Sequence, residues 1–198
     1  MIDNQLDFMD KGILAGVFIA IGACVNMTLG GIAGALFFGV GLLSILYLGL
    51  NLFTGKAGLV VEEKYNIFKL LAVWVMNAIG AILAGWAVSV ATPATQGAAE
   101  AVWAARLSTP PLMLAVKGLF CGILMYIAVS GYRDSKKIEF VILPVSVFIL
   151  CGFCHCVADM AYFGMASNKY NLIDAWPLIP VTIGNFLGCI IPPLVKAK

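Results

Sequence analysis

Charged residues are scarce in this chain: 12 lysines and arginines and 10 aspartates and glutamates stand among 198 residues, and 62% of the residues are hydrophobic. A soluble domain cannot cover its surface with so few charges, so this composition excludes the ordinary soluble classes. The mean hydropathy of +1.02 favours an integral membrane protein. The net charge of +2 gives no reason to expect a nucleic-acid partner.

The apolar runs lack the alternation of apolar and polar residues that membrane β-strands require, so they are typical of transmembrane helices. No charge occurs between Gly12 and Gly55, and this stretch is long enough for two spans with a turn at the polar and glycine-rich residues 26–31. Further spans are expected near residues 70–90, 111–132, 140–158 and 178–195. We predict one domain, residues 1–198, that is all-α and integral to the membrane with six transmembrane helices.

The basic residues outside the spans alternate along the chain. Most of them fall at one end of the expected bundle, and only Arg106 and Lys169 fall in loops at the other end. The positive-inside rule then places both termini in the cytoplasm, with the plasma or inner membrane as the expected location. The first twelve residues are polar and acidic, so we expect no cleavable signal.

Histidine is nearly absent, and His155 is the only one. It lies in an apolar run that carries no acidic or basic residue between Glu139 and Asp159. An ionisable group at mid-membrane costs about 2.5–3.5 kcal/mol even on the lenient insertion scale, which makes His155 a candidate functional residue. The six cysteines lie in or beside apolar spans, where a thiol acts as a small hydrophobe, and no disulfide is predicted.

The segment Cys151-Gly-Phe-Cys154-His155 matches the attachment pattern of c-type haem. A metal site at Cys154, His155 and Cys156 is a second reading. Both of these candidate sites lie within a span. Cys154 and Cys156 would point to different faces of a helix, and the sequence has no second histidine. We therefore expect neither metal nor cofactor, and a membrane redox protein stays as the alternative of a different class.

Glycine-marked breaks occur in the second and fifth spans. The second span ends in Leu52-Phe-Thr-Gly55, and the fifth contains Gly152 just before His155. A pair of interrupted helices at corresponding positions of two halves is the best sequence indication of a transport site. Local evidence also allows Gly55 to be an ordinary helix end.

Four motifs together resemble the formate/nitrite transporter family. They are Leu36-Phe-Phe-Gly-Val-Gly-Leu42 followed by Leu52-Phe-Thr-Gly55, Gly118-Leu-Phe-Cys-Gly-Ile-Leu-Met125, Gly152-Phe-x-His155-x-x-Ala-Asp-Met160, and Gly184-Asn185. The resemblance implies two inverted three-helix repeats with helices 2 and 5 broken, an aquaporin-like arrangement, and a ring of five protomers. It places pathway residues in three sets: an outer constriction of Phe38, Leu52 and Phe148, an inner constriction of Leu42, Phe53 and Met125, and a chamber lined by Thr54, His155 and Asn185.

The chain departs from the family pattern at charged positions. Asp159 and Lys56 stand where asparagine is usual, and Arg106 falls where a lysine is common. We expect Arg106, Asp159 and Lys169 to set the electrostatics of the outer vestibule, with Asp159 either repelling anions or pairing with Arg106 or Lys169.

The resemblance implies channel-like transport of small monovalent weak-acid anions, such as formate, nitrite, hydrosulfide, acetate or lactate. We expect a transporter rather than an enzyme, linked to protons through a central histidine between two hydrophobic constrictions. A neutral-solute channel is the alternative within transport, although the chain lacks the paired Asn-Pro-Ala signature of aquaporins.

Overall fold

The computed structural model describes residues 2–196, and every regular element in them is helical. The helices are α1 (Ile2–Leu29), α2 (Gly31–Leu48), α3 (Phe53–Ala57), α4 (Leu59–Glu62), α5 (Ile67–Ala91), α6 (Ala94–Ser108), α7 (Pro111–Ser135), α8 (Glu139–Leu150), α9 (Cys156–Met165), the 3-10 turn η1 (Leu172–Ala175) and α10 (Leu178–Lys196). The all-α prediction is therefore confirmed.

Five helical segments are long and apolar enough to cross a membrane, and they match the expected spans. They are Asp7–Leu29, Gly31–Leu48, Ile67–Ala91, Pro111–Ser135 and Leu172–Val195. The expected fifth span is divided into the shorter helices α8 and α9, which are separated by residues 151–155. The second span is likewise followed, after residues 49–52, by the short helix α3. Both predicted breaks are present, while the count of six spans stays a prediction.

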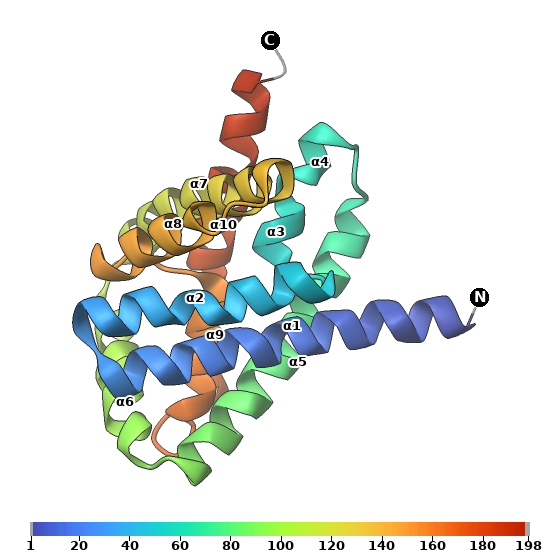
Figure 1. The fold of residues 1–198 in the computed structure, drawn as a ribbon. Coiled ribbons are helices and arrows are strands. Elements are labelled where there is room, and N and C mark those ends of the chain that lie inside the picture. The colour runs from blue at the N-terminus through green and yellow to red at the C-terminus, as the bar shows by residue number, and fades with distance from the viewer. Residues whose placement is uncertain (1, 197–198) are drawn as a thin grey trace.

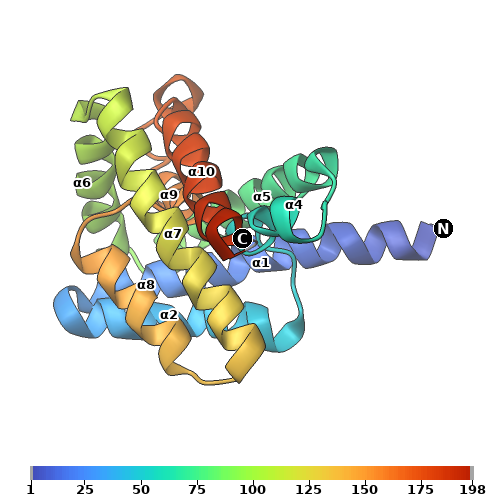
Figure 2. The same cartoon turned by 90° about the horizontal axis from the view of Figure 1, so that it is seen from above.

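The two halves of the chain repeat the same packing. In the first half α1 packs on α5, and in the second half α7 packs on α10, while α2 contacts α8 between the halves. Figure 1 shows α1 and α2 side by side, and it shows the short segments α3 and α9 in the middle of the bundle. In Figure 2, α7 of the second half lies next to α10 and α8.

Glycines let the paired helices approach closely at equivalent places. A Cβ on Gly16 would lie 2.3 Å from the Asn77 carbonyl oxygen, and a Cβ on Gly122 would lie 2.3 Å from the Asn185 carbonyl oxygen. Only a residue without a side chain fits there, which is the usual way in which membrane helices pack without a hydrophobic driving force between them. The same contact at corresponding positions relates α1 and α5 to α7 and α10.

Helix α6 was not expected from the sequence. Arg106, which the hydropathy pattern places in an outer loop, lies in the last turn of this helix. The helix is rich in alanine, a strong helix former, and it buries Ala99 and Trp103 against the rest of the protein. It packs on α9 and so brings Arg106 to the broken fifth span.

Candidate functional site

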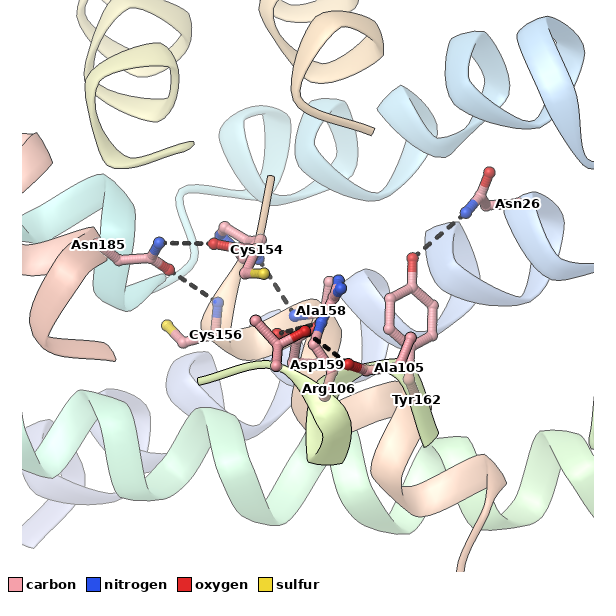
Figure 3. A network of polar contacts seen from close by, with 11 residues as sticks. Asn26, Ala105, Arg106, Cys154, Cys156, Ala158, Asp159, Tyr162 and Asn185 are labelled. Atoms are coloured by element: carbon pink, nitrogen blue, oxygen red, sulfur yellow. Dashed lines mark hydrogen bonds and ion pairs between the residues drawn. The ribbon is translucent and has the colours of Figure 1, made fainter. Parts of the chain in front are cut away.

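Asn185 holds the break between α8 and α9. Its side-chain oxygen accepts a hydrogen bond from the Cys156 amide at 2.7 Å, and its side-chain nitrogen donates to the carbonyls of Gly118 and Cys154, both at 2.8 Å. Figure 3 shows the contacts to Cys154 and Cys156. Asn185 is fully buried, and its amide is occupied by backbone groups. These contacts give it a positioning role, and the chamber-lining role that the resemblance implies stays a prediction.

Asn77 on α5 holds the other break in the same way. Its side-chain oxygen accepts from the Phe53 amide at 2.8 Å, and its side-chain nitrogen donates to the carbonyls of Gly12 and Asn51 at 2.7 and 2.8 Å. A chain that leaves the helical path inside a membrane needs such partners, because lipid offers none to the exposed backbone. Sequence reasoning missed Asn77. The signal was present, since Asn77 and Asn185 both begin an Asn-x-x-Gly pattern.

His155 stands at the N-terminus of α9, where the break ends. Its ring nitrogen Nδ1 accepts a hydrogen bond from the Ala158 amide at 3.1 Å, so the side chain caps the helix. Because Nδ1 is an acceptor, the single proton of the neutral ring lies on Nε2. Nε2 is 2.9 Å from Thr54 Oγ1 and donates to it. The structure thus brings together two of the predicted chamber residues, both of them buried.

The Thr54 hydroxyl has a donor left over. Its oxygen accepts from His155, and among residues 7–195, whose side chains the structure describes, no acceptor is found for its own proton. His155 and Thr54 therefore form a short chain that ends in a free O–H donor. Hydrogen bonds in such chains polarise one another, which strengthens the last donor.

Aromatic residues cover His155 on one side. The ring of Phe148 stacks on the imidazole with 5.8 Å between centroids, and Phe38 meets Phe148 edge to face at 5.9 Å. Both phenylalanines are buried. Phe38 and Phe148, which the resemblance assigns to an outer constriction, are thus in contact with each other.

Two cavities of similar size adjoin the segments that carry His155 and Thr54: one is lined by His155 itself, and the other by Leu52 and Gly55, which flank Thr54 in sequence. The Arg106 cavity, of about 190 Å³, is lined by Arg106, Phe148, His155 and Asp159 among others. The Lys56 cavity, of about 180 Å³, is lined by Leu42, Leu52 and Lys56 among others.

Leu52 lines a different cavity from Phe148, with which the resemblance groups it. It lines the Lys56 cavity beside Leu42, whereas Phe148 lines the Arg106 cavity. Leu52 is the residue with extended backbone that directly precedes α3. Phe53 and Met125 are buried and line neither cavity.

Arg106 and Asp159 form an ion pair in the Arg106 cavity. Arg106 Nε lies 3.2 Å from both carboxylate oxygens of Asp159, with 12% of the arginine side chain and 1% of the aspartate side chain exposed. Figure 3 shows the two side chains facing each other across α6 and α9. Of the two roles expected for Asp159, the structure therefore favours pairing. Tyr162, whose hydroxyl accepts from Asn26 at 3.3 Å, lines the same cavity.

Lys169 does not join this group. Its ammonium nitrogen lies 3.8 Å from Glu100 Oε2 and 5.5 Å from the centre of the Tyr170 ring, and its side chain is 56% exposed. Lys169 is not among the residues that line the Arg106 cavity. The acidic Glu100 offsets its charge, so an effect on the outer vestibule acts at most over a distance.

The cysteines near the break form no metal-binding group with it. Across the part of the chain that the structure describes, no three His, Cys, Asp or Glu side chains are placed to share a metal ion. Both nitrogens of His155 already have partners, Ala158 and Thr54, which makes the ring a poor axial ligand in this conformation.

Residues 4–195 match the model of the formate/nitrite transporter family. Similar proteins include the nitrite transporter NirC of Escherichia coli K12, 27% identical over 94% of this chain and 80% of that protein. The formate channel FocA of Haemophilus influenzae is 26% identical over 92% of this chain and 82% of its own length.

Two solved structures share the fold. One is described as an FNT family ion channel, with a TM-score of 0.86, 22% identity and coverage of 98% of this chain and 90% of that one. The other is a pentameric formate channel with formate bound, with a TM-score of 0.82, 22% identity and 99% coverage of both chains.

Proposed function

We propose that this chain, which belongs to the formate/nitrite transporter family, is an integral membrane channel that conducts small monovalent anions of weak acids together with a proton. Formate, nitrite, hydrosulfide, acetate and lactate are the candidate substrates. The observation that carries the proposal is the buried pair of His155 and Thr54, which lies between apolar residues and presents one free hydroxyl donor.

The apolar surroundings of the pair favour a neutral permeant. Moving a bare anion past Phe38 and Phe148 requires the loss of its hydration shell, which is very unfavourable without a counter-charge. A weak acid avoids this penalty when it takes up a proton and crosses as the neutral molecule. The polar pair then replaces part of the lost hydration by hydrogen bonding.

The capping contact of His155 decides which proton is available. A second proton on the ring would have to sit on Nδ1, and there it would point at the Ala158 amide that now donates to the same atom. A neutral ring can offer its Nε2 proton as a hydrogen bond without giving it away. We therefore infer that the proton travels with the acid and that His155 and Thr54 stabilise its passage.

The assembly and orientation follow from the relatives and the charges. One structural relative is titled a pentameric formate channel, and we propose a homopentamer in which each protomer has its own pathway. The positive-inside rule favours an orientation with both termini in the cytoplasm. The Arg106 cavity is then the outer one, the Lys56 cavity is the inner one, and the bacterial relatives favour the inner membrane.

Uptake into liposomes that contain the purified protein tests the proposal. Formate and nitrite uptake should rise as the external pH falls, because the protonated fraction of each acid grows. Nitrate is the matched control, since it is small, planar and monovalent but is the anion of a strong acid. Equal uptake of nitrate and nitrite at all pH values would contradict proton-linked passage. Uptake of urea or glycerol without anion uptake would favour the neutral-solute channel.

Asp159→Asn should increase the affinity of the Arg106 cavity for anions at neutral pH. The change removes the charge that now offsets Arg106, and about 1 kcal/mol of additional attraction lowers the half-saturation concentration roughly fivefold. Uptake against external formate concentration measures this.

Removal of the other partner of the ion pair gives the control for Asp159→Asn. Arg106→Gln leaves Asp159 buried without its partner, so it should weaken uptake and also destabilise the protein by about 3–5 kcal/mol. The double variant carries no charge at either position and should recover most of the stability. An Asp159→Asn protein with a raised half-saturation concentration would show that the pair itself holds the cavity in shape.

A further inference from the structure

The Lys56 cavity differs in chemistry from the Arg106 cavity. Its walls come from α2, α3, α4 and α7 and are apolar except for two basic residues, Lys56 and Arg133. The cavity reaches the apolar side chains of Leu42 and Leu52. It therefore ends at the same central segment, α3, that carries Thr54.

Arg133 is neutralised by acidic neighbours. Its guanidinium nitrogens lie 3.1 Å from Glu62 Oε2, 3.9 Å from Glu63 Oε1 and 3.7 Å from Asp134 Oδ1. The hydroxyl of Tyr126 also donates to Glu62 and holds this carboxylate in place. Arg133 thus adds little net field to the cavity.

Lys56 has no ion-pair partner of this kind. Its side chain is partly buried, and among the side chains of residues 7–195 its ammonium makes neither a hydrogen bond nor an ion pair. A partly desolvated cation gains much from a counter-charge. Glu62 and Glu63 both form ion pairs with Arg133, and Glu63 attracts Lys56 only over a longer distance. A small anion from solution can therefore supply the counter-charge in direct contact with Lys56.

We propose that the Lys56 cavity is a second anion-binding site, which holds the transported anion at the end of the pathway opposite Arg106. The inference rests on the proposed function. Its volume of about 180 Å³ equals that of about six water molecules, which suits a small carboxylate or nitrite with part of its hydration. Lys56 follows Leu52 by one helical turn, with the Lys56 amide donating to the Leu52 carbonyl at 3.0 Å. An anion bound at Lys56 would therefore lie one helical turn from the apolar side chain of Leu52.

The two cavities give the pathway an electrostatic asymmetry. Arg106 is paired with Asp159, whereas Lys56 is unpaired. The anion should thus bind more tightly at the Lys56 end, and its half-saturation concentration should be lower for flux that starts from that end. An unequal pair of binding sites changes the two half-saturation concentrations and leaves the equilibrium distribution of the anion unchanged.

Formate flux measured from each side of proteoliposomes with a single protein orientation tests the site. Lys56→Gln should raise the half-saturation concentration from the Lys56 end three- to tenfold and leave the value from the Arg106 end unchanged. Lys56→Arg should retain the wild-type value. Lys137→Gln is the matched control, because Lys137 is an exposed lysine in the turn between α7 and α8 that does not line the cavity. An unchanged value in Lys56→Gln, or equal rises from both ends, overturns the proposal.

Binding separates this site from the transport function. Line broadening of ¹³C-formate in the presence of purified protein should be reduced in Lys56→Gln compared with the wild type and with Lys137→Gln. A wild type that broadens the signal but carries no formate would contradict the proposed function and leave the site standing. Equal broadening by wild type and Lys56→Gln would overturn the site whatever the flux.

Discussion

His155→Asn is expected to reduce formate uptake about tenfold, which corresponds to the loss of about 1.4 kcal/mol from one buried hydrogen bond. The substitution removes the Nε2 donor that now supports the Thr54 hydroxyl at 2.9 Å. Asparagine is a good helix cap, so its side-chain oxygen can replace Nδ1 as the acceptor for the Ala158 amide. Uptake into liposomes and thermal unfolding, measured on the same preparation, should show lost transport with retained stability.

The pH profile of the same variant separates two mechanisms. If the proton travels with the acid, uptake by His155→Asn should still rise as pH falls, at a lower rate throughout. If His155 itself supplies the proton, the rise should disappear. Retention of both the wild-type rate and the wild-type profile would remove His155 from the mechanism.

His155→Phe is the comparison that removes both roles. Phenylalanine keeps a ring against Phe148 but offers no acceptor to the Ala158 amide. It should therefore lose transport as His155→Asn does and also unfold at a lower temperature. Equal stability of the two variants would mean that the cap contributes little to α9.

The sequence was sufficient to place the apolar spans and both breaks, for physical reasons. Long apolar runs have few alternatives to a transmembrane helix, and the end of each run could be read from glycine and charge. His155 and Thr54 were found because their motifs flank the two breaks. Their contact over 101 residues of sequence was implied only by the resemblance.

Contacts between segments that are distant in sequence could not be predicted from the hydropathy pattern. Helix α6 has few strongly apolar residues, so its helical state depends on alanine content and on packing against α9. The ion pair of Arg106 with Asp159 depends on that packing, and sequence reasoning could only offer it as one of two options. Leu52 lines the Lys56 cavity and not the Arg106 cavity, which depends on the extended turn before α3, and its place in the outer constriction stays a prediction.

Asn77 shows most clearly what was overlooked. Gly12 and Gly16 on α1 correspond to Gly118 and Gly122 on α7, and the Asn-x-x-Gly pattern of α5 recurs in α10. These short repeats stand in halves with little other similarity. They lie where each half stabilises the break in its interrupted helix. A search for paired polar residues in apolar helices would therefore have found Asn77 together with Asn185.

Asn77→Leu is expected to cause a large loss of stability. Leucine has a similar volume but leaves the Phe53 amide and the Asn51 carbonyl without their partner in an apolar interior. Unsatisfied buried groups cost about 1–3 kcal/mol each, so a loss of about 3 kcal/mol is expected. For a chain of this size that lowers Tm by roughly 6–12 °C. Thermal unfolding of detergent-purified protein measures it.

The pseudo-equivalent position makes this prediction sharper. Asn185→Leu removes the same three contacts from the second break and should lower Tm by a comparable amount, because the two amides hold the same geometry. Asn168→Leu is the control: its side chain is exposed and makes one contact, to Gln96 at 3.3 Å, so Tm should hardly change. A large effect at Asn185 with none at Asn77 would mean that only the break between α8 and α9 depends on its asparagine. In that case α3 is held by packing, and the contacts that place Thr54 opposite His155 come from the second half of the chain alone.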